Sequence, residues 1–276
     1  MHRPTTYLLA LLLLTPALTG CNKFRARVEL KKANALYQQE SYSKALPQFQ
    51  RGIELDPGAT FAWRSVGLTA LALYRPGDAD KQNREYERIA IDAFEKYLED
   101  YPDDSRIHEY LLTMYVNSKQ YDKALAYIDQ QIQATPEKAG ELEGMKVNIL
   151  TQSGRLEQAA QLAQRVPEER RPEILYTVGV SAWDKSFHDP SLDPVTREKL
   201  VDLGLGSIKQ ALDIRPEYFE AMVYYNLLFR EKAKLATDPS QRQGYIDQAT
   251  EWQQKAVELR KKTQAAQQAE QAKPAA

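Results

Sequence analysis

Residues Ser105 to Pro136 decide the fold of this 276-residue chain, and they read SRIHEYLLTMYVNSKQYDKALAYIDQQIQATP. Apolar residues recur three or four positions apart on both sides of a polar turn at Asn117–Gln120, as Ile107, Leu111, Leu112 and Tyr115 and then as Tyr121, Ala124, Leu125, Ile128 and Ile132. That spacing predicts two amphipathic helices joined by the turn. Pro136 is expected to end the second helix, because proline disfavours helical backbone in the residue before it.

The same unit recurs along the chain. A small residue lies early in each second helix, at Ala45, Ala90, Ala124, Ala159, Gly204 and Ala249, so the intervals are 45, 34, 35, 45 and 45 residues. Four positions later an apolar residue follows at Phe49, Phe94, Ile128 and Ile208, whereas Ala163 and Gln253 depart from the pattern. Prolines close units at Pro57, Pro102, Pro136 and Pro216. Small residues let helices approach closely and large apolar ones fill the facing grooves.

First helices carry a matching signature in Trp63-x₂-Val66-Gly67-x₂-Ala70, His108-x₂-Leu111-Leu112-x₂-Tyr115 and Leu175-x₂-Val178-Gly179-x₂-Ala182. This pattern resembles the tetratricopeptide repeat, a 34-residue helix–turn–helix unit. The resemblance covers six units and is weaker over Ala139–Arg171 and in the last one. It implies an all-α, right-handed superhelix (an α-solenoid) of about six helix–turn–helix repeats.

Three units are longer than the others, with the excess between first and second helix at Arg75–Glu85, Lys185–Arg197 and Leu235–Gly244. Each segment contains a helix-start signal, namely Pro76 with Asp78, Asp193-Pro194 and Asp238-Pro239. We therefore expect helices lengthened by a turn or so, joined by Pro/Asp turns at one edge. That edge is either a partner-binding surface or the result of ordinary variation in loop length. Pro47 predicts a kink or a late start in the first unit's second helix.

The first twenty residues predict a cleaved targeting segment. His2 and Arg3 precede an apolar run that begins at Tyr7 and is shorter than a spanning helix needs. Leu18-Thr19-Gly20-Cys21 follows and matches the lipobox of bacterial lipoproteins, which implies lipidation of Cys21 and cleavage before it. The alternative is an ordinary signal peptide with an incidental cysteine. Asn22, in place of the aspartate that retains enteric lipoproteins in the inner membrane, favours the outer membrane by the same resemblance.

The chain is thereby divided into a signal peptide (1–20), a lipidated N-terminus with a short linker (21–24), a superhelix (25–262) and a low-complexity tail (263–276). Its formal net charge of −1 gives no global basic field for nucleic acid or for anionic lipid. Cys21 is the only cysteine, so no disulfide can form within the chain. No cofactor is expected.

Motifs for catalysis or metal binding are incomplete. His108-Glu109 begins like a zinc-protease motif, but Leu112 stands in the place of the second histidine. His188, Asp189 and Asp193 lie together, and turn chemistry explains them better than a weak cation site. Gly204-x-Gly206 lacks the third glycine and the preceding strand of a dinucleotide loop. We predict that the protein is not an enzyme and holds no metal.

The concave groove of such repeats is the expected binding surface. The residues facing it by register are Asn34, Arg64, Arg106, Asn148, Tyr176, Trp183 and Tyr224. Aromatic and arginine side chains are typical interface anchors. Trp183 and Tyr224 fit a groove role and a packing role equally, whereas Tyr225 and Phe229 are expected to pack between helices. Asn34 matches one position of the carboxylate clamp of some tetratricopeptide domains, but Leu30 and Ser65 replace the lysine and asparagine that it needs.

These observations predict an outer-membrane lipoprotein that faces the periplasm and binds protein partners as an adaptor for envelope assembly or secretion. The alternative is an export component whose groove handles a glycan or a secreted polypeptide in transit. Aromatic stacking platforms would favour the glycan, and asparagine and arginine side chains would favour a peptide backbone.

Overall fold

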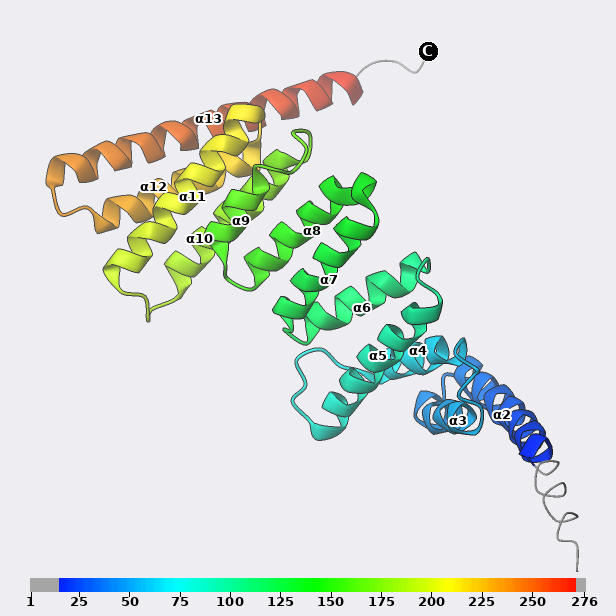
Figure 1. Cartoon of the computed structure of the whole chain (residues 1–276). Helices are drawn as coiled ribbons and strands as arrows, with labels where there is room; N and C mark the ends of the chain where they lie inside the picture. Colours follow the sequence, from blue (N-terminus) through cyan, green and yellow to red (C-terminus); the bar gives the residue numbers. More distant parts are fainter. Residues whose placement is uncertain (1–14, 272–276) are drawn as a thin grey trace, which may run out of the picture. The chain divides into compact units, whose positions relative to one another are not determined.

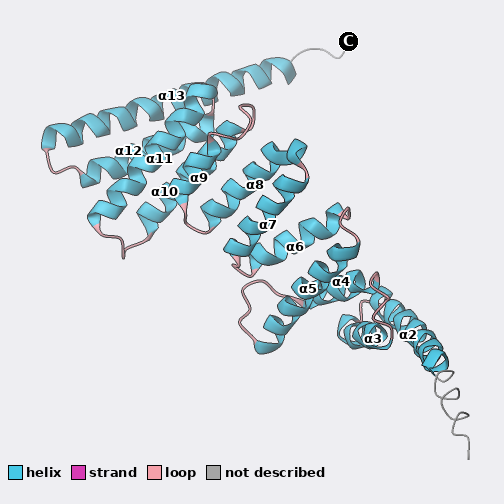
Figure 2. Cartoon of the chain, in the orientation of Figure 1, coloured by secondary structure: helices cyan, strands magenta, loops and turns pink. Residues whose placement is uncertain are grey.

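The computed structural model describes the backbone of residues 15–271 and the side chains of residues 21–268. Predictions for residues 1–14 and 272–276 lie outside this part of the chain. Within it, helices joined by short loops account for the fold and no strand occurs (Figures 1 and 2). The all-α array of helical hairpins is therefore confirmed.

The described part contains six successive pairs of α-helices. The first three are α2 (Thr15–Gln38) with α3 (Tyr42–Leu55), α4 (Ala62–Leu73) with α5 (Lys81–Asp100), and α6 (Ser105–Asn117) with α7 (Tyr121–Ala134). A 3₁₀ turn, η1 (Pro136–Lys138), follows α7. The last three are α8 (Ala139–Gln152) with α9 (Leu156–Ala163), α10 (Arg171–His188) with α11 (Pro194–Ile214), and α12 (Phe219–Leu235) with α13 (Pro239–Gln271).

The chain forms two compact units that divide within α7, unit 1 up to Ala124 and unit 2 from Leu125. In unit 1, α2 packs on α3, α3 on α4, α4 on α5 and α5 on α6. In unit 2, each helix from α8 to α13 packs on its neighbour in the chain, and α10 also contacts α8 and α12. Each unit thus builds its core from successive helices.

The predicted small-and-large pairing carries this packing. A Cβ placed on Gly67 of α4 would lie 2.4 Å from the Phe94 ring of α5, and one on Gly179 of α10 would lie 2.5 Å from Ile208 of α11. Phe94 and Ile208 are fully buried. Since real Cβ atoms do not approach other atoms this closely, the glycines set the distance between the two helices of these hairpins.

Residues 105–136 form the two helices and the turn that their sequence predicts. Asp104 caps α6 by accepting a hydrogen bond from the Ile107 amide. After Asn117 the chain reverses at Lys119, which has a φ of 59°, and the Gln120 amide donates to the Tyr115 carbonyl at 2.8 Å. The second helix, α7, ends at Ala134, two residues before Pro136.

The three long units place their extra residues mainly in their second helices, which span 20 residues in α5, 21 in α11 and 33 in α13. Asp193 and Asp238 cap α11 and α13 as predicted. The start signal at Pro76 and Asp78 is wrong, because α5 begins at Lys81 and is capped by Asp80. Its preceding loop is instead held by the buried Asn83 side chain, which bonds to Arg75 and Asp78.

Three further features concern the ends and the continuity of helices. Pro47 does not delay α3, which begins at Tyr42 and contains the proline on an exposed position. Helix α2 runs without a break through residues 21–24, which were expected to be a linker. Helix α13 continues to Gln271, into the expected tail. Among the described residues, no helix combines the length and the apolar character that crossing a membrane requires.

Candidate functional site

Three of the predicted groove residues meet in unit 2. Tyr176 and Trp183 are seven residues apart on α10 and so lie on one face of that helix. Tyr224, on α12, has its ring centroid 5.7 Å from that of Tyr176 and 5.3 Å from that of Trp183, and both pairs meet edge to face. All three side chains are half-buried. Aromatic pairs in this geometry attract one another beyond the area they bury, so the cluster is stable and still reaches solvent.

A pocket of about 490 Å³ opens beside this cluster. The turn between α8 and α9 provides one wall through Gln152, Ser153 and Gly154. Helix α10 provides the other through Trp183, Asp184 and Lys185, and Tyr224 completes the lining. Gly154 has a φ of 76°, and a Cβ there would lie 3.6 Å from the ammonium of Lys185. The left-handed backbone therefore favours glycine at this position, and Lys185 lies beside it.

The hydroxyls of Tyr176 and Tyr218 remain protonated at neutral pH. Burial, followed by the neighbouring Tyr176, raises the pKa of Tyr218 to about 12. Burial and the nearby Tyr224 likewise raise the pKa of Tyr176. Tyr218 packs against Tyr176 with ring centroids 5.2 Å apart. Tyr176 and Tyr218 consequently offer neutral hydroxyls that can donate or accept hydrogen bonds, and the pocket lining adds the carboxylate of Asp184 and the ammonium of Lys185.

The Trp183 ring is largely engaged by its neighbours. Phe187 stacks on it with centroids 5.1 Å apart and planes inclined by 15°, while Tyr224 and His188 meet it edge to face. Its buried Nε1 has no hydrogen-bond partner among the described residues. A buried donor without a partner carries a free-energy penalty of about 1–3 kcal/mol. Trp183 therefore packs against Phe187 and also lines the pocket.

The remaining predicted groove residues do not join this cluster. Asn34 and Arg106 are exposed in unit 1, and Asn148 is exposed on α8 of unit 2. Arg64 is half-buried in unit 1, where its Nε lies 3.2 Å from a carboxylate oxygen of Asp104. Whether these four residues, or Tyr176, Trp183 and Tyr224, bind a partner stays a prediction.

The structure adds members that the register argument missed. Phe187 and Tyr218 complete the aromatic cluster, while Lys185 and Gly154 border the pocket. Phe187 follows Trp183 by one helical turn, which was a usable signal. Tyr218 precedes the first residue of α12 and Gly154 lies in a turn, so helical periodicity could not find either of them.

Tyr225 and Phe229 pack between helices as expected, each only 7% exposed. The polar loop after α10 is explained by turn chemistry. Asp189 accepts hydrogen bonds from the amide and hydroxyl of Ser191, and Asp193 accepts from the amides that open α11. His108 contacts the Pro102 carbonyl at 2.7 Å. No group of three histidine, cysteine, aspartate or glutamate residues suited to a metal occurs in the described part.

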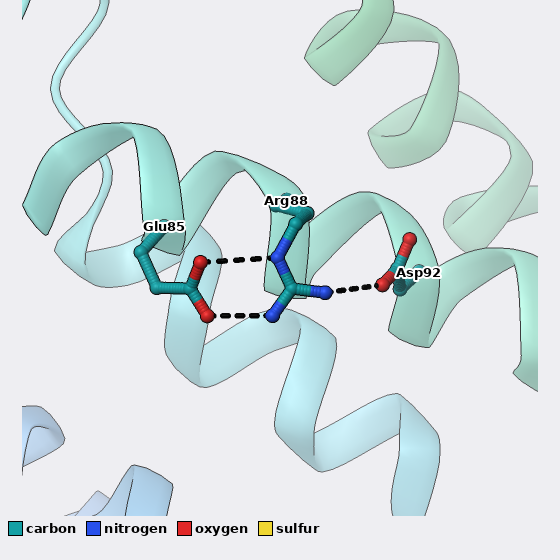
Figure 3. Close-up of polar contacts among 3 residues, drawn as sticks. All are labelled: Glu85, Arg88 and Asp92. Atoms are coloured by element: carbon teal, nitrogen blue, oxygen red, sulfur yellow. Dashed lines mark hydrogen bonds and ion pairs between the residues drawn. The ribbon is translucent and has the colours of Figure 1, made fainter. Parts of the chain in front are cut away.

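A second hollow, of about 640 Å³, lies on the first turns of α5 and has a different character. Its lining comes from one charged stretch of the chain, residues 80–88. Figure 3 shows that Arg88 is held there by two carboxylates, with bonds of 3.0 and 2.6 Å to Glu85 and 2.8 Å to Asp92. The hydrogen bond from Arg88 lowers the pKa of Glu85. These exposed ion pairs satisfy one another, so this hollow is a solvated helix face.

Comparison with known proteins agrees with the hairpin architecture. The family model of the tetratricopeptide repeat matches residues 30–89 and 77–139. No curated protein matches the sequence. Among solved structures, YrrB, described as a tetratricopeptide protein with an unusual peptide-binding site, is similar at 22% identity and a TM-score of 0.41, over 70% of this chain and 88% of its own.

Two bacterial repeat proteins are also similar. The C-terminal part of a tetratricopeptide protein from Cytophaga hutchinsonii has 14% identity and a TM-score of 0.47, over 83% of this chain and 78% of its own. A tetratricopeptide protein from Bacteroides fragilis has 13% identity and a TM-score of 0.42, over 76% of this chain and 98% of its own. Residues 30–139 of this chain therefore match the tetratricopeptide repeat.

Proposed function

We propose that this protein is a scaffold that holds a polypeptide partner against α8, α10 and α12 of unit 2, at the pocket beside Trp183 and Tyr224. Stacked helical repeats present extended surfaces that suit protein partners. The observation that carries the proposal is the pocket itself, where half-buried aromatic side chains adjoin Lys185, Asp184 and the α8–α9 turn. Aromatic anchors beside polar groups are the composition typical of a protein-binding hot spot.

A polypeptide suits this chemistry better than a glycan. Sugars stack on open aromatic faces, whereas one face of Trp183 is covered by Phe187 and the ring of Tyr224 meets Trp183 edge to face. Gln152, Ser153 and Tyr224 of the lining supply donors and acceptors for a peptide backbone. A glycan or a secreted polypeptide in transit remains the alternative occupant, and direct binding measurements with each class distinguish the two.

The proposal places this scaffold in the bacterial envelope, anchored by lipid at Cys21 to the outer membrane and facing the periplasm. Leu18-Thr19-Gly20-Cys21 supports the anchor. Labelling cells with a fatty-acid analogue tests it: wild type should incorporate the label and Cys21→Ser should not. Separating inner from outer membranes then tests the location. Label in the Cys21→Ser variant, or none in wild type, would remove the anchor from the account.

The partner surface is tested by crosslinking in native cells. Wild type should capture a defined envelope protein, and Lys185→Glu should reduce that capture because it reverses the charge at the pocket. Lys199→Glu, an exposed lysine of α11 outside the pocket lining, is the matched control and should capture normally. Variants of Tyr176, Trp183 and Tyr224 to alanine extend the test, provided that circular dichroism shows them folded. Capture unaffected by every pocket variant would contradict the assignment.

A further inference from the structure

Helix α2 has one face that packs on α3 and an opposite face that is exposed. Ala26, Leu30 and Ala33 are buried against α3 at 1%, 7% and 0% exposure. Phe24 and Val28, by contrast, are 69% and 37% exposed although both are apolar. At about 100° per residue, they point roughly 160–200° away from Ala26. Figure 1 shows α3 along one side of α2, which leaves the other side uncovered by it.

The exposed Cys21 belongs to the same face. Cys21, Phe24 and Val28 are spaced by three and four residues, so they form one stripe along the helix. A lone exposed phenylalanine needs no explanation, but a stripe of apolar residues that begins at the predicted lipid acceptor does.

Cations border this stripe on both sides. Residues 23–32 contain Lys23, Arg25, Arg27, Lys31 and Lys32 against a single acid, Glu29, in a chain whose formal net charge is −1. Glu29 pairs with Lys32 at 3.4 Å. The other four cations have no ion-pair partner within the described part of the chain. By helical spacing, Arg25 and Lys32 fall on one flank of the stripe, and Arg27 and Lys31 on the other.

We propose that the stripe Cys21–Phe24–Val28 and its flanking cations form a membrane-surface face, which lies in the headgroup layer of an anionic bilayer. Phe24 and Val28 enter the boundary between headgroups and acyl chains, and the cations contact lipid phosphates. Apolar insertion and electrostatic attraction to anionic lipid are the two forces that hold interfacial helices. Charge complementarity selects the occupant, since the three unpaired flanking cations, Arg25, Arg27 and Lys31, repel a basic protein partner and attract a phosphate-rich surface.

This inference deepens the proposed membrane attachment without depending on the lipid. A lipid at Cys21 alone would leave the protein free to pivot on a flexible tether. Helix α2 runs unbroken from Cys21 into its contacts with α3, so contact along the stripe would orient unit 1 on the bilayer. The stripe would thus add a second membrane contact beside the lipid, and the two together would fix the orientation of unit 1.

The experiment uses residues 21–276 with Cys21→Ser, which keeps every buried contact of α2 and removes lipidation. Vesicles of phosphatidylethanolamine and phosphatidylglycerol in equal parts should bind this protein at low salt, and vesicles of phosphatidylcholine should bind it weakly. Arg25→Gln, Arg27→Gln and Lys31→Gln together should lower binding to the anionic vesicles by about 100-fold. Phe24→Ala with Val28→Ala should lower it about tenfold or more.

Two matched controls lie elsewhere on unit 1. Phe61→Ala removes an aromatic ring that is 58% exposed, against 69% for Phe24, and Lys44→Gln, Arg51→Gln and Lys81→Gln remove the same charge. Both controls should bind vesicles like the parent protein. No binding by the parent, or equal loss in a control, overturns the proposal. The proposal is also overturned if vesicle binding falls when the cations are replaced but not when Phe24 and Val28 are replaced, because a site for polyanions alone would behave that way. Fatty-acid labelling of Cys21 is a separate readout, so failure of either hypothesis is recognisable.

Discussion

At the scale of single residues, the fold rests on contacts where glycine meets a large side chain. Gly179 faces Ile208, Gly204 faces Leu228, and each added Cβ would lie under 3 Å from its neighbour. Replacing a helical glycine with alanine ordinarily stabilises a helix by about 1 kcal/mol. At these positions overpacking opposes that gain. The sign of the change in the free energy of unfolding therefore shows whether the contact exists.

Gly179→Ala is expected to lower the free energy of unfolding by about 1–3 kcal/mol, because its methyl group overlaps Ile208. Ile208→Val in the same chain should recover part of that loss. Gly206→Ala is the matched control on α11, where nothing lies within 4 Å of the added Cβ, and it should stabilise by about 0.5–1 kcal/mol. Urea unfolding measures all three. Stabilisation by Gly179→Ala would contradict the packing account.

The side chain of Asp104 is expected to make the free energy of unfolding depend on pH. Burial opposes its ionisation, but hydrogen bonds from the Ile107 amide, Arg64 and Tyr97 outweigh burial and hold its pKa below the usual value. Because the folded pKa is depressed, the stabilisation is present above the unfolded pKa of about 4 and is lost as pH falls through the folded pKa.

Asp104→Asn should therefore lower the free energy of unfolding by about 1 kcal/mol at neutral pH, and the difference from wild type should shrink below about pH 4. Unfolding in urea at several pH values measures it. The exposed neighbour Asp103→Asn serves as the control and should match wild type throughout. A difference between Asp104→Asn and wild type that does not change with pH would show that the carboxylate's charge does not matter.

At the scale of elements, sequence reasoning found the hairpins because helical periodicity and caps are local. Asp193 and Asp238 could be identified as caps from their neighbours alone. The start of α5 could not, because Asn83 bonds back to Arg75 and Asp78 and Gly77 takes a φ of 81°, which keeps that loop out of the helix. The candidate site shows the same limit. Periodicity placed Tyr176 and Trp183 on one face, whereas the pocket also needs the α8–α9 turn.

Pro47 offers a test of α3. It lies within the helix on an exposed position and removes the amide that would donate to the Ser43 carbonyl. Pro47→Ala should restore that hydrogen bond without changing buried contacts, and should raise the free energy of unfolding by about 1–3 kcal/mol. Thermal unfolding by calorimetry measures it. A lower melting temperature for Pro47→Ala would mean that the proline is required where it stands.

At the scale of the whole molecule, two compact units each carry their own stack of hairpins. The family model matches residues within 30–139, whereas the pocket beside Trp183 lies in unit 2, outside the matched region. The last helix closes the core of unit 2, because Ala249 and Ala256 of α13 are buried and Trp252 packs on Tyr225 with ring centroids 5.0 Å apart. The described residues of α13 after Thr263 are exposed.

Truncation separates these two parts of α13. Deleting residues 264–276 should leave the melting temperature within about 1 °C of wild type, because the ion pair of Lys262 with Glu217 and all buried contacts remain. Deleting residues 239–276 should destabilise unit 2 strongly, since it uncovers Tyr225 and Phe229. Calorimetry compares the two deletions. A large fall in melting temperature from the shorter deletion would contradict the conclusion that the residues after Thr263 lie outside the core.

The central claim is that a polypeptide binds at the pocket beside Trp183 and Tyr224. The most direct measurement inserts a photocrosslinking amino acid at Gln152 or Lys185, which border the pocket from two sides, and at Lys199 on α11 as the control. Irradiation of living cells should join the same envelope protein to both pocket positions and not to Lys199. Absence of a shared partner at Gln152 and Lys185, or equal capture at Lys199, would contradict the claim.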